Sequence, residues 1–236
     1  MKKLSIIIPC YNEEKTIIPL LISINKVQLT DGIEKEIVII DDKSSDNSIS
    51  IINKYNEEND NKIKLLINEK NCGKGYSIRK GINECNGDYI IIQDADLEYS
   101  PSEYNKLLGP ILNNFADVVY GSRFKGGDPH RVLFFWHSIG NKILTFLSNI
   151  STNLNLTDME TCYKLFKKDI IKKIQLKENR FGFEPEVTAK ISKIKNIKIY
   201  EVGISYNGRT YDEGKKINWK DGFRAIYCII KYSFVK

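Results

Sequence analysis

Short apolar runs alternate with amphipathic stretches along the first half of the chain. The apolar runs are rich in β-branched residues, as strands buried on both faces are, and lie at 5–8, 36–40, 63–67, 89–92 and 117–120. Helical patterns lie between them at 16–25, 48–55, 75–85 and 101–113. This alternation implies right-handed crossovers and predicts an α/β fold, a doubly wound, mostly parallel sheet with helices on both faces.

The pattern is less regular in the second half of the chain. It predicts an aromatic-rich helix, a short strand, a second helix and another strand, at about 131–154, near 163–166, from near Glu184 and at 197–202. A C-terminal amphipathic helix is predicted from about Trp219. We therefore expect one domain over 1–236.

The residues that follow each predicted strand carry most of the functional information, because ligands of parallel sheets bind beyond the carboxyl ends of the strands. Polar or charged segments follow four of the five strands, at 9–14, 41–46, 94–98 and 121–123. Acidic and basic side chains are thus delivered to one edge of the sheet, which predicts a binding site there.

The segment Asp94-Ala95-Asp96 follows the apolar run at 89–93. Alternate residues of an extended segment share a face, so Asp94, Asp96 and Glu98 are expected to converge. Carboxylates that crowd together repel unless a cation lies between them, and oxygen ligands suit Mg²⁺ or Mn²⁺. The alternative interpretation is an acidic turn that caps the next helix.

Three other strand-end residues are candidates for donor binding. Asp41 lies where Rossmann-type proteins hold a ribose, but the glycine-rich dinucleotide fingerprint is missing after the first strand. Lys74 opens a helix and is a candidate anion ligand, although its surroundings do not match a P-loop. Arg123 is well placed for a diphosphate. The only two histidines, His130 and His137, are interpreted as structural.

Composition changes this picture only slightly. With 236 residues, 42% of them hydrophobic, the chain suffices for one well-cored domain. The net charge of +6 is a mild bias toward anionic partners, and it alone is no reason to predict nucleic-acid binding. Five dispersed cysteines suggest reduced thiols and a cytoplasmic location. No apolar run approaches the roughly 20 residues of a spanning helix.

Taken together, the motifs over about 4–124 resemble the family-2 inverting glycosyltransferases of GT-A fold. Within that family the chain resembles the dolichol-phosphate mannose synthase-like branch, with further support from 158–166, 181–186 and 208–215. The resemblance implies a nucleotide-sugar-binding half at 1–124 and an acceptor-side half at 125–236. No Gln-x-x-Arg-Trp motif is present, which argues against a processive polysaccharide synthase.

The resemblance also implies roles for individual residues. Nucleoside contacts would come from Pro9, Tyr11, Glu13 and Asp41. The segment of Asp94, Ala95 and Asp96 would contact ribose, diphosphate and metal, and Arg123 a phosphate. The extra carboxylate of Glu98, where the mannose synthases usually carry Gln, would join the metal ligands. Arg209 and Lys215 would close over the diphosphate or the acceptor phosphate.

The acceptor expected from the resemblance is a polyprenyl phosphate. A phosphate acceptor needs cations and no general base, whereas a hydroxyl of a glycan or lipid-linked saccharide needs a base. Glu184 and Glu186 are the candidate bases, and helix initiation is the alternative role for Glu184. A nucleotidyltransferase and a non-catalytic nucleotide-sugar-binding protein are weaker alternatives.

The predicted C-terminal helix carries two adjacent stripes. One is apolar, with Trp219, Phe223, Ile226, Ile230 and Phe234. The other is basic, with Lys216, Lys220, Arg224 and Lys231. The pair predicts peripheral contact with an anionic membrane, with the aromatic run 134–136 as a second contact. The alternative is that the apolar stripe packs on the sheet and the basic residues are solvated.

Overall fold

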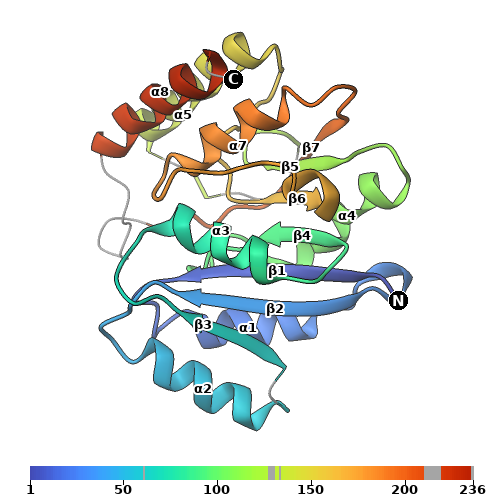
Figure 1. The fold of residues 1–236 in the computed structure, drawn as a ribbon, viewed down its shortest axis with the longest axis vertical. Coiled ribbons are helices and arrows are strands. Elements are labelled where there is room, and N and C mark those ends of the chain that lie inside the picture. The colour runs from blue at the N-terminus through green and yellow to red at the C-terminus, as the bar shows by residue number, and fades with distance from the viewer. Residues whose placement is uncertain (61, 127–130, 133, 210–218, 235–236) are drawn as a thin grey trace.

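A computed structural model describes residues 1–236 except 61, 127–130, 133, 210–218 and 235–236. In this described part, seven strands form one sheet in the order β3-β2-β1-β4-β6-β5-β7 (Figure 1). The strands are β1 (Lys3–Cys10), β2 (Glu34–Asp41), β3 (Ile63–Ile67), β4 (Tyr89–Ile92), β5 (Val118–Ser122), β6 (Lys164–Lys167) and β7 (Ile199–Gly203). Every paired neighbour is parallel except β6, which runs antiparallel to both β4 and β5. The doubly wound, mostly parallel sheet is confirmed.

The strands form because their β-branched residues are buried on both faces. Ile6 and Ile7 of β1 and Ile90 and Ile91 of β4 are completely buried at the centre of the sheet. Helix α3 packs closely on this centre because Gly81 has no side chain: a Cβ there would lie 2.5 Å from a methyl of Ile7. The core is therefore continuous through the sheet and its covering helices.

The helices agree with the predicted alternation. They are α1 (Ile17–Lys26), α2 (Ser48–Glu58), α3 (Lys74–Glu84), α4 (Tyr104–Leu112), α5 (Phe135–Thr152), α6 (Lys168–Ile171), α7 (Phe183–Ile191) and α8 (Trp219–Phe234), with short 3₁₀ turns at Thr30–Gly32 and Pro101–Glu103. Helices α1 and α3 lie on opposite faces of the sheet (Figure 1). The predicted C-terminal helix is confirmed as α8.

Helices α5 and α8 form a separate layer. They pack against each other and against α7, at the end of the molecule farthest from β3 (Figure 1). Among the described helices, none has the length and apolar character needed to span a membrane.

Candidate functional site

A cavity of about 880 Å³ lies where the carboxyl ends of the parallel strands meet. The register that pairs Cys10 of β1 with Asp41 of β2 brings these two strand ends level at the edge of the sheet. Helices α5, α7 and α8 supply the opposite wall. The predicted residues that line the cavity are Pro9, Tyr11, Glu13, Lys74, Asp94, Ala95, Asp96, Glu98, Arg123, Glu184 and Arg209. Lys215 lies outside the described residues.

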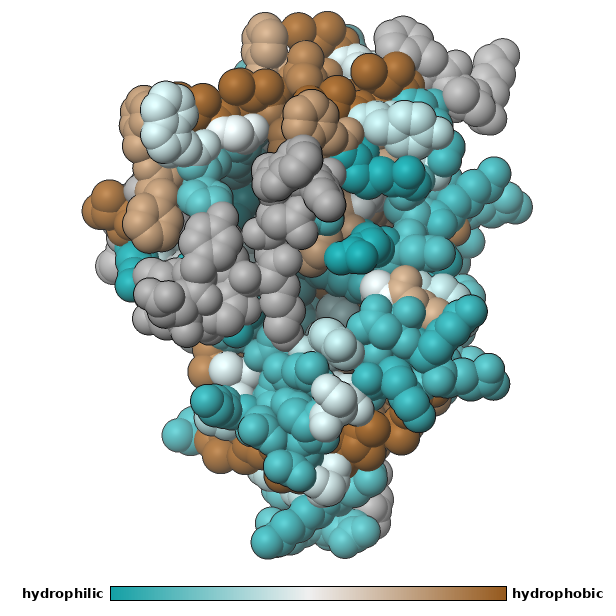
Figure 2. All heavy atoms as spheres, turned by 90° about the vertical axis from the view of Figure 1, so that its left-hand side faces the viewer, coloured by the Kyte–Doolittle hydropathy of each residue, from teal (hydrophilic) through white to brown (hydrophobic). Residues whose placement is uncertain are grey.

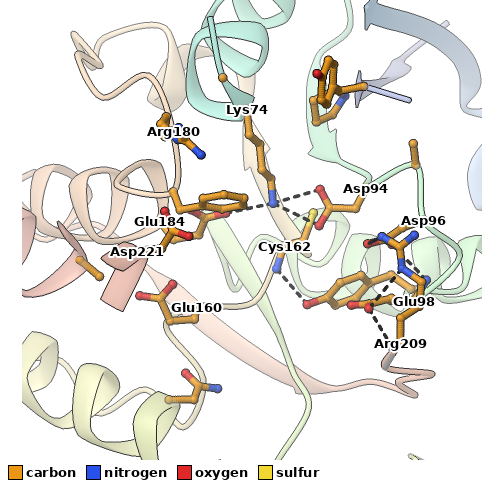
Figure 3. Close-up of a pocket in the computed structure, with 18 of the residues that line it drawn as sticks. Lys74, Asp94, Asp96, Glu98, Glu160, Cys162, Arg180, Glu184, Arg209 and Asp221 are labelled. Carbon is orange, nitrogen blue, oxygen red and sulfur yellow. Dashed lines mark hydrogen bonds and ion pairs between the residues drawn. The ribbon is translucent and has the colours of Figure 1, made fainter. Parts of the chain in front are cut away.

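Lys74 links the two walls of the cavity. Its ammonium lies 3.0 Å from a carboxylate oxygen of Asp94 and 3.2 Å from one of Glu184 (Figure 3). Burial alone would lower the pKa of Lys74, but the two carboxylates outweigh it and raise that pKa well above its usual value. Lys74 is therefore a charged bridge between the segment that follows strand β4 and helix α7.

The loop before Lys74 is shaped by a glycine. Gly73 has a φ of +96°, and a Cβ there would lie 2.4 Å from the backbone oxygen of Asn179. A side chain at this position would push the loop away from the 178–180 segment. The carboxylate of Asp42 fixes the same loop by accepting the backbone N–H groups of Cys72 and Gly73, at 2.8 and 2.7 Å. These contacts position the start of α3 at the cavity.

Arg209 lies near three other carboxylates of the cavity. Its guanidinium is 2.9 Å from Asp96, 3.5 Å from Glu13 and 3.6 Å from Glu98 (Figure 3). Glu98 also accepts hydrogen bonds from the Arg209 backbone N–H at 2.8 Å and from the hydroxyl of Tyr206 at 2.6 Å. A residue from the second half of the chain thus compensates carboxylates delivered by the first.

The segment that carries the three predicted metal ligands, Asp94, Asp96 and Glu98, is not extended as predicted. Leu97 has a φ of +64°, so the chain turns between Asp96 and Glu98 instead of remaining extended. Asp94 points toward Lys74, whereas Glu98 is held by Tyr206 and Arg209 (Figure 3). Among the residues that the structure describes, no three acidic, histidine or cysteine side chains are arranged to hold a metal ion.

The site nevertheless fits a divalent cation that would take some of its ligands from the protein and the others from a bound substrate. Burial, together with the neighbouring Asp94 and Glu98, raises the pKa of Asp96 to about 7. A carboxyl group whose ionisation is so unfavourable gains from a nearby cation, and oxygen ligands suit Mg²⁺ or Mn²⁺. Asp94 and Asp96 are the residues that would hold it.

The raised pKa of Asp96 also predicts that the stability of the metal-free protein, measured with a chelator present, depends on pH. Its pKa in the folded protein, about 7, lies above the ordinary 3.8, so the folded protein retains a proton that the unfolded chain releases between these values. The protonated Asp96 contributes fully to the free energy of unfolding below pH 3.8. This contribution is lost as the pH rises through about 7.

We therefore expect the melting temperature of the metal-free protein to fall by at least about 3 °C more between pH ~5 and pH ~8 than that of Asp96→Asn. Thermal unfolding followed by circular dichroism measures this difference. Equal pH slopes in the two proteins would contradict the raised pKa.

Arg123 is held in place by a residue absent from the predicted site. Its guanidinium forms a two-pronged ion pair with Asp158, at 2.6 and 2.7 Å, and the Arg123 backbone N–H donates to the same carboxylate. Asn141 of α5 adds a hydrogen bond to Asp158 at 3.0 Å, and the ring of Tyr206 lies 5.1 Å from the guanidinium carbon. Asp158 is completely buried, so this pair fixes the orientation of Arg123 at the cavity wall.

Sequence reasoning missed several residues of the cavity wall. Glu160, Cys162, Arg180 and Asp221 all line the cavity (Figure 3). Burial and the neighbouring Glu184 raise the pKa of Glu160 to about 8. One carboxyl oxygen of Glu160 and one of Glu184 have no hydrogen-bond partner within the described part of the chain. Such atoms in a cavity wall are candidate contacts for a ligand.

The structure places one of the two histidines at the cavity. His137 of α5 is among the lining residues, and its structural role stays a prediction. His130 lies outside the described residues.

Two predicted site residues are not brought to the cavity wall. Asp41 is completely buried, and its carboxylate accepts hydrogen bonds from the backbone N–H and hydroxyl of Ser44, at 2.8 and 2.5 Å. Glu186 is also completely buried. It accepts the backbone N–H groups of Lys177 and Glu178, both at 2.7 Å. Of the two candidate bases, only Glu184 lines the cavity.

Comparison with known families adds independent information. The family model described as glycosyl transferase family 2 matches residues 5–175, which contain most of β1, all of β2 to β6 and most of the described site. The chain belongs to glycosyl transferase family 2. This match continues past residue 124, so the region that matches the family includes the antiparallel strand β6 and the segment that contains Asp158 and Glu160.

Similar family members act on lipid phosphates according to their names. The chain is 28% identical over 218 residues to an undecaprenyl-phosphate 4-deoxy-4-formamido-L-arabinose transferase of Photorhabdus laumondii, covering 91% of the chain and 63% of that protein. It is 27% identical over 245 residues to the UDP-N-acetylglucosamine–dolichyl-phosphate N-acetylglucosaminyltransferase of Methanococcus voltae, covering 97% and 95%. It is 26% identical to the dolichol-phosphate mannosyltransferase of Pyrococcus furiosus, covering 98% and 64%. The chain thus spans less than two thirds of the Photorhabdus and Pyrococcus proteins.

Solved structures with low sequence identity share the fold. A glucosyl-3-phosphoglycerate synthase from Mycobacterium tuberculosis, in complex with Mn²⁺, UDP and phosphoglyceric acid, superposes with a TM-score of 0.75 at 17% identity, covering 100% of the chain and 80% of that structure. Another complex of the same enzyme contains Mg²⁺ and UDP, with a TM-score of 0.73. The GT-A fold expected from the sequence is confirmed.

Proposed function

We propose that this protein transfers a hexose from a nucleoside-diphosphate sugar of the GDP-mannose or UDP-glucose type to a polyprenyl phosphate, with inversion at the anomeric carbon. The observation that carries the proposal is one cavity in which the carboxylates of Asp94 and Asp96 lie near the cations of Lys74, Arg123 and Arg209. This charge pattern suits a metal-bound diphosphate. The names of the relatives support the acceptor class.

In this proposal the first half of the chain binds the donor. Pro9, Tyr11 and Glu13 line the cavity at the end of β1, where they would contact the nucleoside. When bound at Asp94 and Asp96, Mg²⁺ or Mn²⁺ would neutralise charge on the diphosphate. Arg123, whose guanidinium is oriented in advance by Asp158, adds positive charge where the departing diphosphate becomes more negative.

The bond changes require no proton transfer. An oxygen of the acceptor phosphate attacks the anomeric carbon from the face opposite the diphosphate. The bond from that carbon to the diphosphate breaks, and its electron pair leaves with the diphosphate. Arg209, and Arg180 on the opposite wall, supply positive charge near the cavity that would attract the acceptor phosphate.

A hydroxyl acceptor is the second candidate, and Glu184 is the residue that favours it. This carboxyl lines the cavity, and one of its oxygens has no hydrogen-bond partner among the described residues. The other oxygen is ion-paired to Lys74 at 3.2 Å. A carboxylate so placed could accept a proton from a hydroxyl nucleophile.

Glu184→Gln distinguishes the two acceptor classes. For a phosphate acceptor we expect transfer to stay within roughly an order of magnitude, because no proton is removed. A hydroxyl acceptor predicts a loss of about 10³-fold or more with the fold intact. Glu186→Gln is the matched comparison: its buried carboxylate binds two backbone N–H groups and Lys190, so we expect lower stability, by about 1–3 kcal/mol, and little change in the rate of folded enzyme.

The proposed function is tested by a donor screen followed by a transfer assay. Thermal shift with Mn²⁺ and each of several GDP- and UDP-sugars identifies the donor, since a ligand that binds the folded state raises the melting temperature. The selected donor is then incubated with a short-chain polyprenyl phosphate, and glycolipid and nucleotide are quantified. Absence of donor binding to folded protein would refute the assignment. Transfer only to glycan hydroxyls would favour the second candidate.

A further inference from the structure

Helices α5 and α8 expose an extended apolar surface. Eight of their large hydrophobic residues are between 51% and 79% exposed: Phe135, Trp136, Ile143, Phe146, Ile150, Phe223, Tyr227 and Ile230. We call these residues the α5–α8 face. In a space-filling view, apolar atoms gather at the end of the molecule formed by these helices, and polar atoms cover most of the opposite end (Figure 2). Contiguous apolar surface of this kind usually marks an interaction site.

The spacing of these residues shows an organised surface. On α5, Ile143, Phe146 and Ile150 recur at helical intervals and form one stripe. On α8, Phe223 and Ile230 lie on an exposed stripe, whereas Ala225, Cys228, Ile229 and Tyr232 face inward and are buried. Phe223 and Ile230 were two of the residues considered for packing on the sheet, and that alternative is wrong for them.

The charged side chains that the structure describes on α5 and α8 are mostly positive. The sequence has no Asp or Glu from residue 131 to residue 157, and Arg131 and Lys142 are exposed there. The only carboxylate within α8, Asp221, lines the cavity. The surface therefore complements anionic headgroups.

Two residues of the basic stripe predicted for α8 make ion pairs within the protein. Arg224 and Lys231 reach the buried carboxylate of Glu178, at 2.7 and 3.4 Å, and so anchor α8 to the loop before α7. Lys216 and the side chain of Lys220 are outside the described part. Apolar contact, more than charge, would thus dominate binding to this surface.

The α5–α8 face adjoins the cavity. Gly140 and Leu144 of α5 and Gly222 and Ala225 of α8 line the cavity from the same two helices. Trp136 belongs both to the cavity wall and to the α5–α8 face, since it lines the cavity and is 79% exposed. Whatever covers the face therefore lies next to the site that would bind the acceptor.

We propose that the α5–α8 face inserts into the surface of an anionic lipid bilayer and holds the cavity at the level of lipid headgroup phosphates. This inference rests on the proposed lipid-phosphate acceptor, whose phosphate could then reach the cavity while its chain stays in the membrane. A second copy of the chain is a poorer occupant. A two-fold interface would bring the same cations together, and residues 131–157 offer no carboxylate to pair with them.

Tryptophan fluorescence tests the insertion directly. The chain has two tryptophans, so Trp219→Phe leaves Trp136 as the only indole, on the proposed surface. With vesicles of phosphatidylglycerol and phosphatidylcholine we expect a blue shift, and quenching by brominated lipid chains. Co-sedimentation should persist at high salt, because apolar insertion is not screened.

Two double variants and one control locate the contact. Phe146→Asp/Ile150→Asp on α5 and Phe223→Asp/Ile230→Asp on α8 should each weaken vesicle binding by at least about tenfold, since each loses two inserted apolar side chains. Phe115→Asp is the matched control, because Phe115 is 57% exposed but lies in the α4–β5 connection. It should bind vesicles like wild type. None of these positions lines the cavity.

The activity readout separates this inference from the proposed function. Both double variants should retain transfer to a short, water-soluble prenyl phosphate and lose transfer to a long polyprenyl phosphate in vesicles. Vesicle binding without any transfer would refute the proposed function and leave the insertion standing. Unquenched Trp136, or a dimer that the double variants convert to monomer in light scattering, would overturn the insertion.

Discussion

Asp96→Ala is expected to reduce sugar transfer by at least about 10³-fold, or roughly 4 kcal/mol of transition-state stabilisation. Burial and the neighbouring Asp94 and Glu98 disfavour the ionised carboxylate of Asp96 and raise its pKa to about 7. A divalent cation shared with the donor diphosphate would stabilise that ionised carboxylate, so the loss should appear in turnover and in metal-dependent donor binding.

Steady-state kinetics with saturating Mn²⁺, and donor titrations with and without chelator, measure the effect. Asp169→Ala is a suitable control, because its carboxylate is 69% exposed on α6, remote from the cavity lining. The metal-sharing role is excluded if Asp96→Ala keeps near-normal turnover, or if it weakens donor binding equally in chelator.

Asp158→Ala is expected to have the largest effect on stability. The substitution leaves the Arg123 guanidinium inside the protein without its two-pronged partner. Loss of one member of a buried ion pair typically costs about 3–5 kcal/mol. For a chain of this size that corresponds to a fall in melting temperature of roughly 10 °C.

A double-mutant cycle checks the origin of this effect. Replacing both partners, in Arg123→Met/Asp158→Met, should be markedly less destabilising than Asp158→Ala, because no charge is left unpaired. Additive effects of the two single substitutions would show that the ion pair itself is not responsible. Activity should be lost in the double variant even where it folds, since Arg123 lines the cavity.

The first half of the site was predictable because parallel sheets convert sequence order into position. A buried strand followed by polar residues places those residues at the carboxyl edge, whichever helix comes next. Pro9, Lys74, Asp94 and Arg123 all reach the cavity for this reason. The family resemblance rested on the same strand ends, and the match over residues 5–175 confirms it.

The remaining contacts depend on backbone turns and on partners distant in sequence. Asp158 is 35 residues from Arg123, and no local pattern indicates that the two pair. The positive φ of Leu97 could not be predicted from the sequence either, since leucine rarely adopts it. This backbone turn nevertheless directs Glu98 away from Asp94. A strand-like alternation was the wrong assumption for a segment that is a turn.

Helix α7 illustrates the limit for neighbouring residues of one type. Glu184 and Glu186 are both acidic, both in the first turn of the helix and both buried. Glu184 faces Lys74 across the cavity, whereas Glu186 faces the 177–178 backbone. Their roles are set by how α7 is rotated against the sheet, a tertiary property that the spacing of two glutamates cannot specify.

Strand β6 has a consequence for how the chain acquires its structure during synthesis. It lies between β4 and β5, and residues up to Lys167 must leave the ribosome before these two earlier strands gain their shared neighbour. Until then β4 and β5 each present an unpaired edge, which is prone to aggregation. We therefore expect a fragment that stops at residue 124 to be insoluble, and nascent chains to depend on chaperones until β6 has been synthesised.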